Sequence, residues 1–167
     1  KKFTKKNIKK KKKTIDLIYY NRDHSSKKKI IFNNVLKEVS KKFKVVVIGD
    51  LLSEKNVKNL NLVSKKKTNH LIHKSKFTFA SPENIFSMFT LECLSLNTKI
   101  FYDKKQAIIK KFFYTKNLIP INFANYQEAI KKVNMNLGKK YKQDRVKFNS
   151  KYWKKKVMDF DSYFLTC

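Results

Sequence analysis

Residues 45–48 are the stretch that most constrains the fold, because they read Val-Val-Val-Ile and are followed directly by Gly49 and Asp50. A strand with one solvated face alternates apolar and polar residues, whereas a strand covered on both faces is apolar throughout. An unbroken β-branched run is therefore typical of an interior strand in a parallel sheet. Shorter apolar runs predict further strands at residues 15–20, 59–63, 77–80, 99–102 and 118–123.

Helical patterns separate these strands. Residues 28–42 carry apolar side chains at helical spacing, and similar patterns predict helices at 65–74, 104–115, 125–136 and 141–164. A further helix is predicted to begin at the Ser-Pro-Glu of residues 81–83. This alternation predicts an α/β fold, a single Rossmann-like domain with a mainly parallel, doubly wound sheet. Such sheets bind ligands at the carboxyl ends of their strands, near the point where the strand order reverses.

The predicted domain spans residues 14–167 and ends in helices, with Tyr152, Trp153 and Phe160 packing back on it. Residues 1–13 contain nine lysines and are predicted to be a linker or tail. A chain of 167 residues is long enough for one hydrophobic core and short for two. No apolar run approaches the roughly 20 residues that cross a bilayer.

The net charge of +29 suggests a ribosomal or other nucleic-acid-associated protein. Of the 41 basic residues, however, 39 are lysines, whereas bases and phosphates are preferentially recognised by arginine. The abundant residue types have AT-rich codons, so we interpret much of the charge as a solvated surface that reflects genomic composition. A basic nucleic-acid-binding protein remains the alternative hypothesis.

The cysteines and histidines predict no metal site. Cys93 and Cys167 lack the spacing of a zinc site or a disulfide scaffold, and we expect Cys93 to be a buried apolar residue. His70 and His73 lie three residues apart on one predicted helix, without a nearby acidic residue or cysteine to complete a site.

The turn after the first strand holds the first candidate site residues. Arg22 and Lys27 are expected at the carboxyl edge of the sheet, where they would neutralise a diphosphate and stabilise it as a leaving group. Arg22 is one of only two arginines in the chain. His24, in the same turn, is a further candidate phosphate contact.

The turn after residue 80 holds the second group. Glu83 is expected at the start of a helix, and Glu92 about two and a half turns further along. A helix N-terminus offers N–H groups to an anion, and flanking carboxylates bind sugar hydroxyls. Asn84 and Ser87 would lie beside the phosphate. This combination suits a nucleotide-sugar better than a nucleic acid.

From residue 14 onward, the chain resembles the C-terminal donor-binding domain of group 1 glycosyltransferases with the two-domain GT-B architecture. The resemblance rests on four segments in collinear order: Arg22 with Lys27, residues 45–50, residues 57–64 and residues 81–94. Residues 148–153 in addition resemble the closing helix of the family. Glu83 and Glu92 are one residue further apart than is usual in that family. Asn84, Phe86 and Ser87 replace its glycines, so Ser87 is a candidate hydroxyl contact.

The resemblance implies a retaining glycosyltransferase. Arg22 and Lys27 would hold the donor diphosphate, Glu83 would contact the transferred sugar, and Glu92 the ribose. No metal or other cofactor is implied, and the acceptor would be a glycan or a lipid-linked glycan of the cell envelope. The family binds its acceptor on a separate N-terminal domain, so we expect a fragment that is inactive without that domain or a partner chain. We expect it in the cytoplasm, with peripheral contact to anionic membrane through the lysine tail.

Overall fold

The computed structural model describes residues 13–22, 32–81, 84–142, 144 and 146–152. The strands of the main sheet are β1 (Ile15–Asn21), β2 (Val45–Gly49), β3 (Val57–Leu60), β4 (Ser75–Phe79), β5 (Lys99–Asp103) and β7 (Leu118–Ile121). The helices are α1 (Phe32–Ser40), α2 (Lys65–Lys74), α3 (Met88–Ser95), the 3₁₀ turn η1 (Lys104–Gln106), α4 (Ile109–Phe112) and α5 (Tyr126–Leu137). Two short strands, β6 (Phe113–Tyr114) and β8 (Lys147–Phe148), pair antiparallel.

The main sheet has the strand order β3-β2-β1-β4-β5-β7, and each of its neighbouring strands pairs in parallel. Leu17 of β1 lies opposite Val45 on one side and Phe77 on the other. The order runs outward in both directions from β1 and β4, so the strand order reverses between these two strands. The predicted parallel, doubly wound sheet is confirmed.

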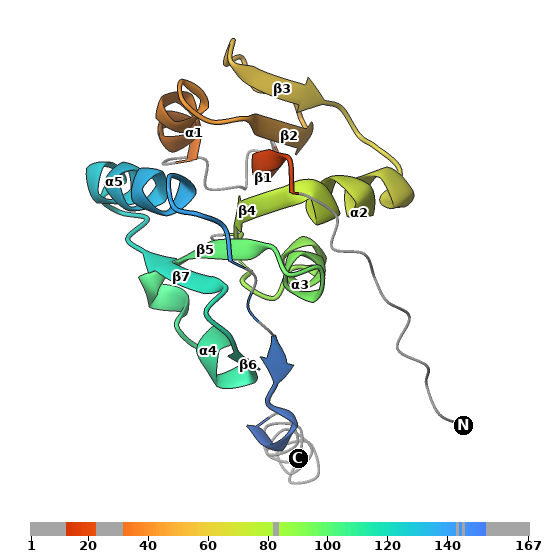
Figure 1. Cartoon of the computed structure of the whole chain (residues 1–167), viewed down its shortest axis with the longest axis vertical. Helices are drawn as coiled ribbons and strands as arrows, with labels where there is room; N and C mark the ends of the chain where they lie inside the picture. The colour runs from red at the N-terminus through yellow and green to blue at the C-terminus, as the bar shows by residue number, and fades with distance from the viewer. Residues whose placement is uncertain (1–12, 23–31, 82–83, 143, 145, 153–167) are drawn as a thin grey trace, which may run out of the picture.

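Helices cover both faces of the sheet (Figure 1). On one face, α1 and α5 bury Val35, Leu36 and Val133 against side chains of β1, β2 and β4. On the other face, Ile72 of α2 and Cys93 and Leu94 of α3 pack with Ile18 of β1. All five residues of β2 are buried, as its unbroken apolar sequence predicts for an interior strand. Cys93 is a buried free thiol, as expected.

Two predicted helices are shorter than expected. The helix after β4 begins at Met88 and not at residues 81–83, because the Ser87 side chain, rather than the Ser-Pro-Glu, accepts the capping hydrogen bond at 3.3 Å from Thr90 N–H. The helix predicted at 104–115 is divided into η1 and α4 and ends in β6. The Asp103 carboxylate caps η1 at Lys105 N–H, which starts a separate turn.

Two further predictions are corrected. The third strand occupies Val57–Leu60 rather than 59–63, because the Asn59 amide makes two hydrogen bonds to the Leu52 backbone and fixes the strand there. The described residues between 141 and 149 are not helical: β8 lies in this stretch, and helical backbone begins at Ser150. Trp153 and Phe160 lie outside the described residues, whereas Tyr152 does pack back, against Phe112.

Lys13, assigned from sequence to the end of the tail, is buried at the amino end of the sheet. Its Nζ donates to Ser75 O at 2.7 Å and to Thr98 Oγ1 at 3.2 Å, and lies 5.5 Å from the centre of the Tyr141 ring. Burial lowers the pKa of Lys13 to about 8.

Among the described residues, none of the helices has the length and apolar character needed to span a bilayer.

Candidate functional site

The carboxyl end of β1 is fixed to the end of β2. The Asn21 side chain donates to Asp50 O at 2.9 Å, and Asp50 N–H donates to Asn21 O at 3.1 Å. Gly49 has a φ of +93°, and a Cβ built on it would lie 2.2 Å from Asn21 O. A glycine is therefore required here, both for the left-handed backbone and for the close approach of the two strand ends. This contact determines where the chain leaves β1, immediately before Arg22.

Arg22 is exposed at this edge of the sheet. Its guanidinium carbon lies 5.7 Å from the centre of the Tyr20 ring, a cation–π distance. The Tyr20 ring in turn lies 5.5 Å from the ring of Phe89, the second residue of α3. The structure therefore connects Arg22, through Tyr20, to the first turn of the helix that follows β4. Sequence alone predicted the shared edge but not this connection.

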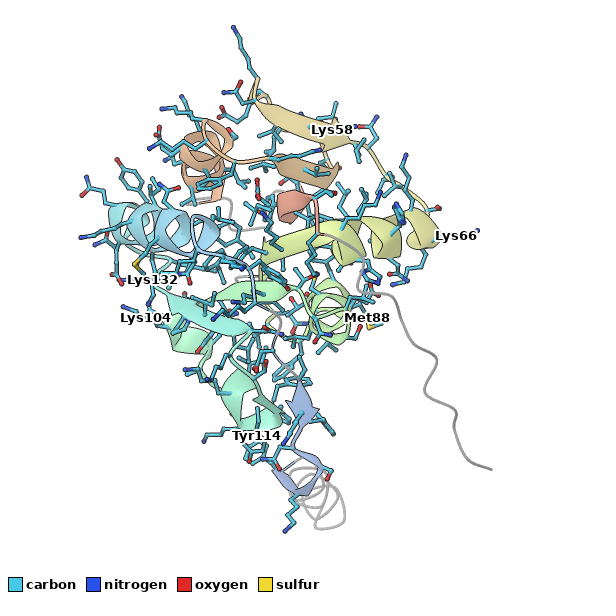
Figure 2. All side chains as sticks on the ribbon, in the orientation of Figure 1. Lys58, Lys66, Met88, Lys104, Tyr114 and Lys132 are labelled. Carbon is cyan, nitrogen blue, oxygen red and sulfur yellow. The ribbon has the colours of Figure 1, made fainter. Side chains whose placement is uncertain are left out.

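The N-terminus of α3 is the second component. Thr90 N–H donates to Ser87 Oγ and Leu91 N–H to Ser87 O, whereas helix geometry leaves the N–H groups of Met88 and Phe89 without partners inside the helix. No acidic residue lies in the first turn. The Met88 side chain at this helix end is exposed to solvent (Figure 2). The two N–H groups and the helix dipole are suited to an anion.

Ser87 and Asn84 have local structural roles. Ser87 Oγ caps α3 and lies 2.9 Å from Thr90 Oγ1, so its hydroxyl is already hydrogen-bonded. Asn84 Oδ1 accepts from Phe86 N–H at 2.9 Å, and Asn84 O accepts from Ser87 N–H at 3.1 Å. These bonds fold residues 84–87, the site loop, into a compact turn that leads into α3. Asn84 itself is exposed beside that helix start.

Gln106, which sequence reasoning did not identify, holds the chain just before the site loop. Its Nε2 donates to Ser81 O at 3.2 Å, so η1 after β5 is attached to the turn after β4. Parallel neighbours β4 and β5 bring these two turns together at the carboxyl edge. The residues are 25 positions apart and belong to no shared motif, so no local sequence signal indicates the contact.

Glu92 forms an ion pair with Lys65, the first residue of α2. The carboxylate is mostly buried, whereas Lys65 is exposed. Both helices begin at the carboxyl edge of the sheet, so the pair joins them just below that edge. Lys65 was not predicted as a site residue. The signal that could have identified it is its position directly after Ser64, which caps α2.

Lys27, His24 and Glu83 lie outside the described residues. Of the predicted set, the structure places Arg22 after β1 and Asn84 and Ser87 after its parallel neighbour β4, with Glu92 about one turn into α3. Within the described part of the chain, no three His, Cys, Asp or Glu side chains form a metal-binding cluster. A guanidinium, together with two helix N–H groups that have no partner inside the helix, can bind a phosphate or diphosphate.

Comparison with solved structures identifies similar folds. HepE of Anabaena, in complex with UDP and glucose, matches 75% of this chain with a TM-score of 0.58 and 14% identity. The UDP-GlcNAc 2-epimerase of Methanocaldococcus jannaschii, in complex with UDP-GlcNAc and UDP, matches 89% with a TM-score of 0.53 and 13% identity. The Escherichia coli heptosyltransferase WaaC with ADP matches 75% with a TM-score of 0.50 and 10% identity.

These matches show that the chain has the fold of one GT-B half-domain, as the sequence resemblance implied. The chain spans 39%, 46% and 45% of the lengths of the three matched proteins, which is less than half of each. No protein-family profile and no curated protein matched the sequence.

Proposed function

We propose that this chain is the donor-binding half of a retaining nucleotide-sugar glycosyltransferase. The observation that supports this most strongly is the position of Arg22 and the α3 N-terminus. Both lie where the strand order reverses, in a fold whose solved examples hold UDP or ADP. In a doubly wound sheet this is the place where a ligand binds. The donor diphosphate would lie between the guanidinium and the N–H groups of Met88 and Phe89.

The proposed chemistry is electrostatic. When the bond from sugar to diphosphate breaks, negative charge develops on the departing diphosphate. A fixed guanidinium and a helix N-terminus stabilise that charge without a proton transfer. Arg22 would form a bidentate contact with phosphate oxygens, which a lysine cannot reproduce geometrically. Lys27 and His24 are proposed as further phosphate contacts. No step in this scheme requires a metal ion bound by the protein.

The remaining roles are proposed from the family resemblance. Glu83 would contact the transferred sugar and Glu92 the ribose, with Asn84 and Ser87 beside the phosphate. The Lys65–Glu92 ion pair supports the ribose role, because it holds the carboxylate in place on α3. The acceptor, a glycan or lipid-linked glycan, would bind to a second domain or partner chain. Peripheral contact with anionic membrane is a compatible proposal.

UDP titration by calorimetry at fixed salt tests the proposal, with ADP as a second ligand. Arg22→Ala removes charge-assisted hydrogen bonds worth about 2 kcal/mol, so UDP affinity should fall about thirtyfold. Lys58→Ala is the matched control, since Lys58 is an exposed cation on the edge strand β3 (Figure 2). It should leave UDP affinity unchanged. Equal losses in both variants, or none in Arg22→Ala, would overturn the proposed site.

The same titration separates this proposal from the nucleic-acid alternative. The labelled lysines of Figure 2 lie on β3, α2, η1 and α5, so positive charge is spread around the molecule. Binding through such a surface is diffuse and falls steeply with salt. UDP binding at one site should instead saturate at one ligand per chain and survive salt that releases a single-stranded oligonucleotide.

A further inference from the structure

We propose that three aromatic rings, Phe86, Phe112 and Tyr152, couple the C-terminal segment of the chain to the site loop, with Phe112 as the positioning residue. This ring ladder joins residues 84–87 to α4 and then to the helical backbone that begins at Ser150. The predicted effect of the ladder on donor affinity rests on the proposed function, whereas the coupling between the rings and the loop does not.

The ladder consists of two edge-to-face contacts. The Phe86 and Phe112 ring centres are 5.0 Å apart at 79°, and those of Phe112 and Tyr152 are 4.8 Å apart at 84°. Both contacts have the favoured geometry of aromatic pairs. Phe112 is buried between its two neighbours. A displacement of Tyr152 therefore removes one edge-to-face contact of the ring that holds Phe86.

Apart from the bonds of Ser87 to α3, the described contacts that attach the site loop to its surroundings are made by side chains. The hydrogen bonds from Asn84 N–H to Ser81 Oγ, from Phe86 N–H to Asn84 Oδ1 and from Ser87 N–H to Asn84 O all stay within residues 81–87. Ile85 packs in the core, and Phe86 packs on Phe112. The position of the α3 N-terminus relative to Arg22 thus depends on how firmly these side chains are held, in addition to the packing of Phe89 on Tyr20.

The C-terminal end of the ladder is anchored on α4 and β6 through Asn149. Asn149 N–H donates to Phe112 O at 2.7 Å, and its side-chain amide donates to Lys111 O at 2.9 Å and to the Tyr114 hydroxyl at 2.7 Å. Asn149 Oδ1 also accepts from Tyr152 N–H at 3.2 Å. One residue therefore fixes both the strand pairing and the start of the segment that carries Tyr152.

The ladder lowers the cost of donor binding, because a loop already ordered before binding loses less conformational entropy when the donor arrives. Loosening Tyr152 weakens the packing of Phe112 and, through it, of Phe86, and binding must then order the loop again. Tyr152 touches neither Arg22 nor α3 among the ring contacts described, so its effect on affinity would be transmitted through Phe112.

Phe148 provides a matched control. It also contributes one aromatic ring from the C-terminal segment, but that ring packs on Phe113, at 5.6 Å, on the neighbouring strand. Tyr152→Ala should weaken UDP binding about fivefold or more, and Tyr152→Phe, which keeps the ring, should restore wild-type affinity. Phe148→Ala should leave the affinity unchanged. Thermal melts of all variants identify any loss that reflects unfolding alone.

Hydrogen exchange tests the coupling without any ligand. Amide exchange at residues 84–88 should accelerate in Tyr152→Ala and stay at the wild-type rate in Phe148→Ala. Unchanged exchange in Tyr152→Ala, or equal acceleration in both variants, would overturn the coupling. If wild-type protein bound no UDP, the proposed function would fail while the exchange result still decided the ladder.

Discussion

Replacing Gly49 by alanine tests whether the junction between β1 and β2 is as close as the structure shows. The new Cβ would lie 2.2 Å from Asn21 O, so the two strand ends must move apart by about 1 Å to reach an ordinary contact. The residue would also have to keep a φ of +93° with a side chain present.

The expected loss follows from two contributions. Holding a non-glycine residue in the left-handed region costs about 1–2 kcal/mol. Separation of the strand ends weakens the two hydrogen bonds between Asn21 and Asp50, each worth about 1 kcal/mol. The free energy of unfolding should therefore fall by about 3–4 kcal/mol, which lowers the melting temperature of a chain this size by about 10 °C.

Urea denaturation followed by circular dichroism measures this loss, and the only other glycine in the chain supplies the control. Gly138 ends α5 with a φ of −71°, and its added Cβ would lie 3.3 Å from Asn134 O. Gly138→Ala should change the stability by less than about 1 kcal/mol. A loss of that size or smaller in Gly49→Ala would show that the strand ends are not packed as closely as described.

Three further predictions concern the core and the α3 cap. Lys13 has a folded-state pKa of about 8, below its ordinary value of 10.5, so between pH 8 and pH 10.5 the unfolded chain binds more protons than the folded chain. Urea unfolding at each pH should therefore show the stability of the wild type, relative to Lys13→Met, rising by about 2–3 kcal/mol from pH 8 to pH 10.5. Burial raises the pKa of the Cys93 thiol, so a Cys167→Ser variant should react with a thiol reagent only when urea unfolds it; rapid reaction in the native state would contradict the burial. Ser87→Ala removes the α3 cap and should cost about 1 kcal/mol in urea, whereas an unchanged midpoint would argue against the cap.

Hydrophobic patterning was sufficient to predict the main sheet. The unbroken run of β2 indicates a strand covered on both faces, β1, β5 and β7 each contain a run of apolar residues, and in β4 two phenylalanines flank Thr78. The helix predicted at residues 65–74 matches α2 because Ser64 is a strong capping residue. Patterning was insufficient where side chains decide the boundaries, as Ser87 does for α3 and Asn59 for β3.

The candidate site was predictable only in outline. Arg22 and the turn after β4 could be assigned to one edge, because parallel strands end together. The Arg22–Tyr20–Phe89 connection, the Gln106 contact with Ser81 and the Lys65–Glu92 pair join residues far apart in sequence. Periodicity carries no information about such contacts, since they depend on how separate elements pack.

We propose above that a donor diphosphate binds between Arg22 and the start of α3. Titration of ¹⁵N-labelled protein with UDP, followed by NMR, tests this most directly because each backbone amide is observed separately. We predict saturable shifts at Arg22, Met88 and Phe89, and none at Lys58 or along α5. Shifts spread over the lysines of β3 and α5, with Met88 and Phe89 unchanged, would show that UDP does not bind at this site.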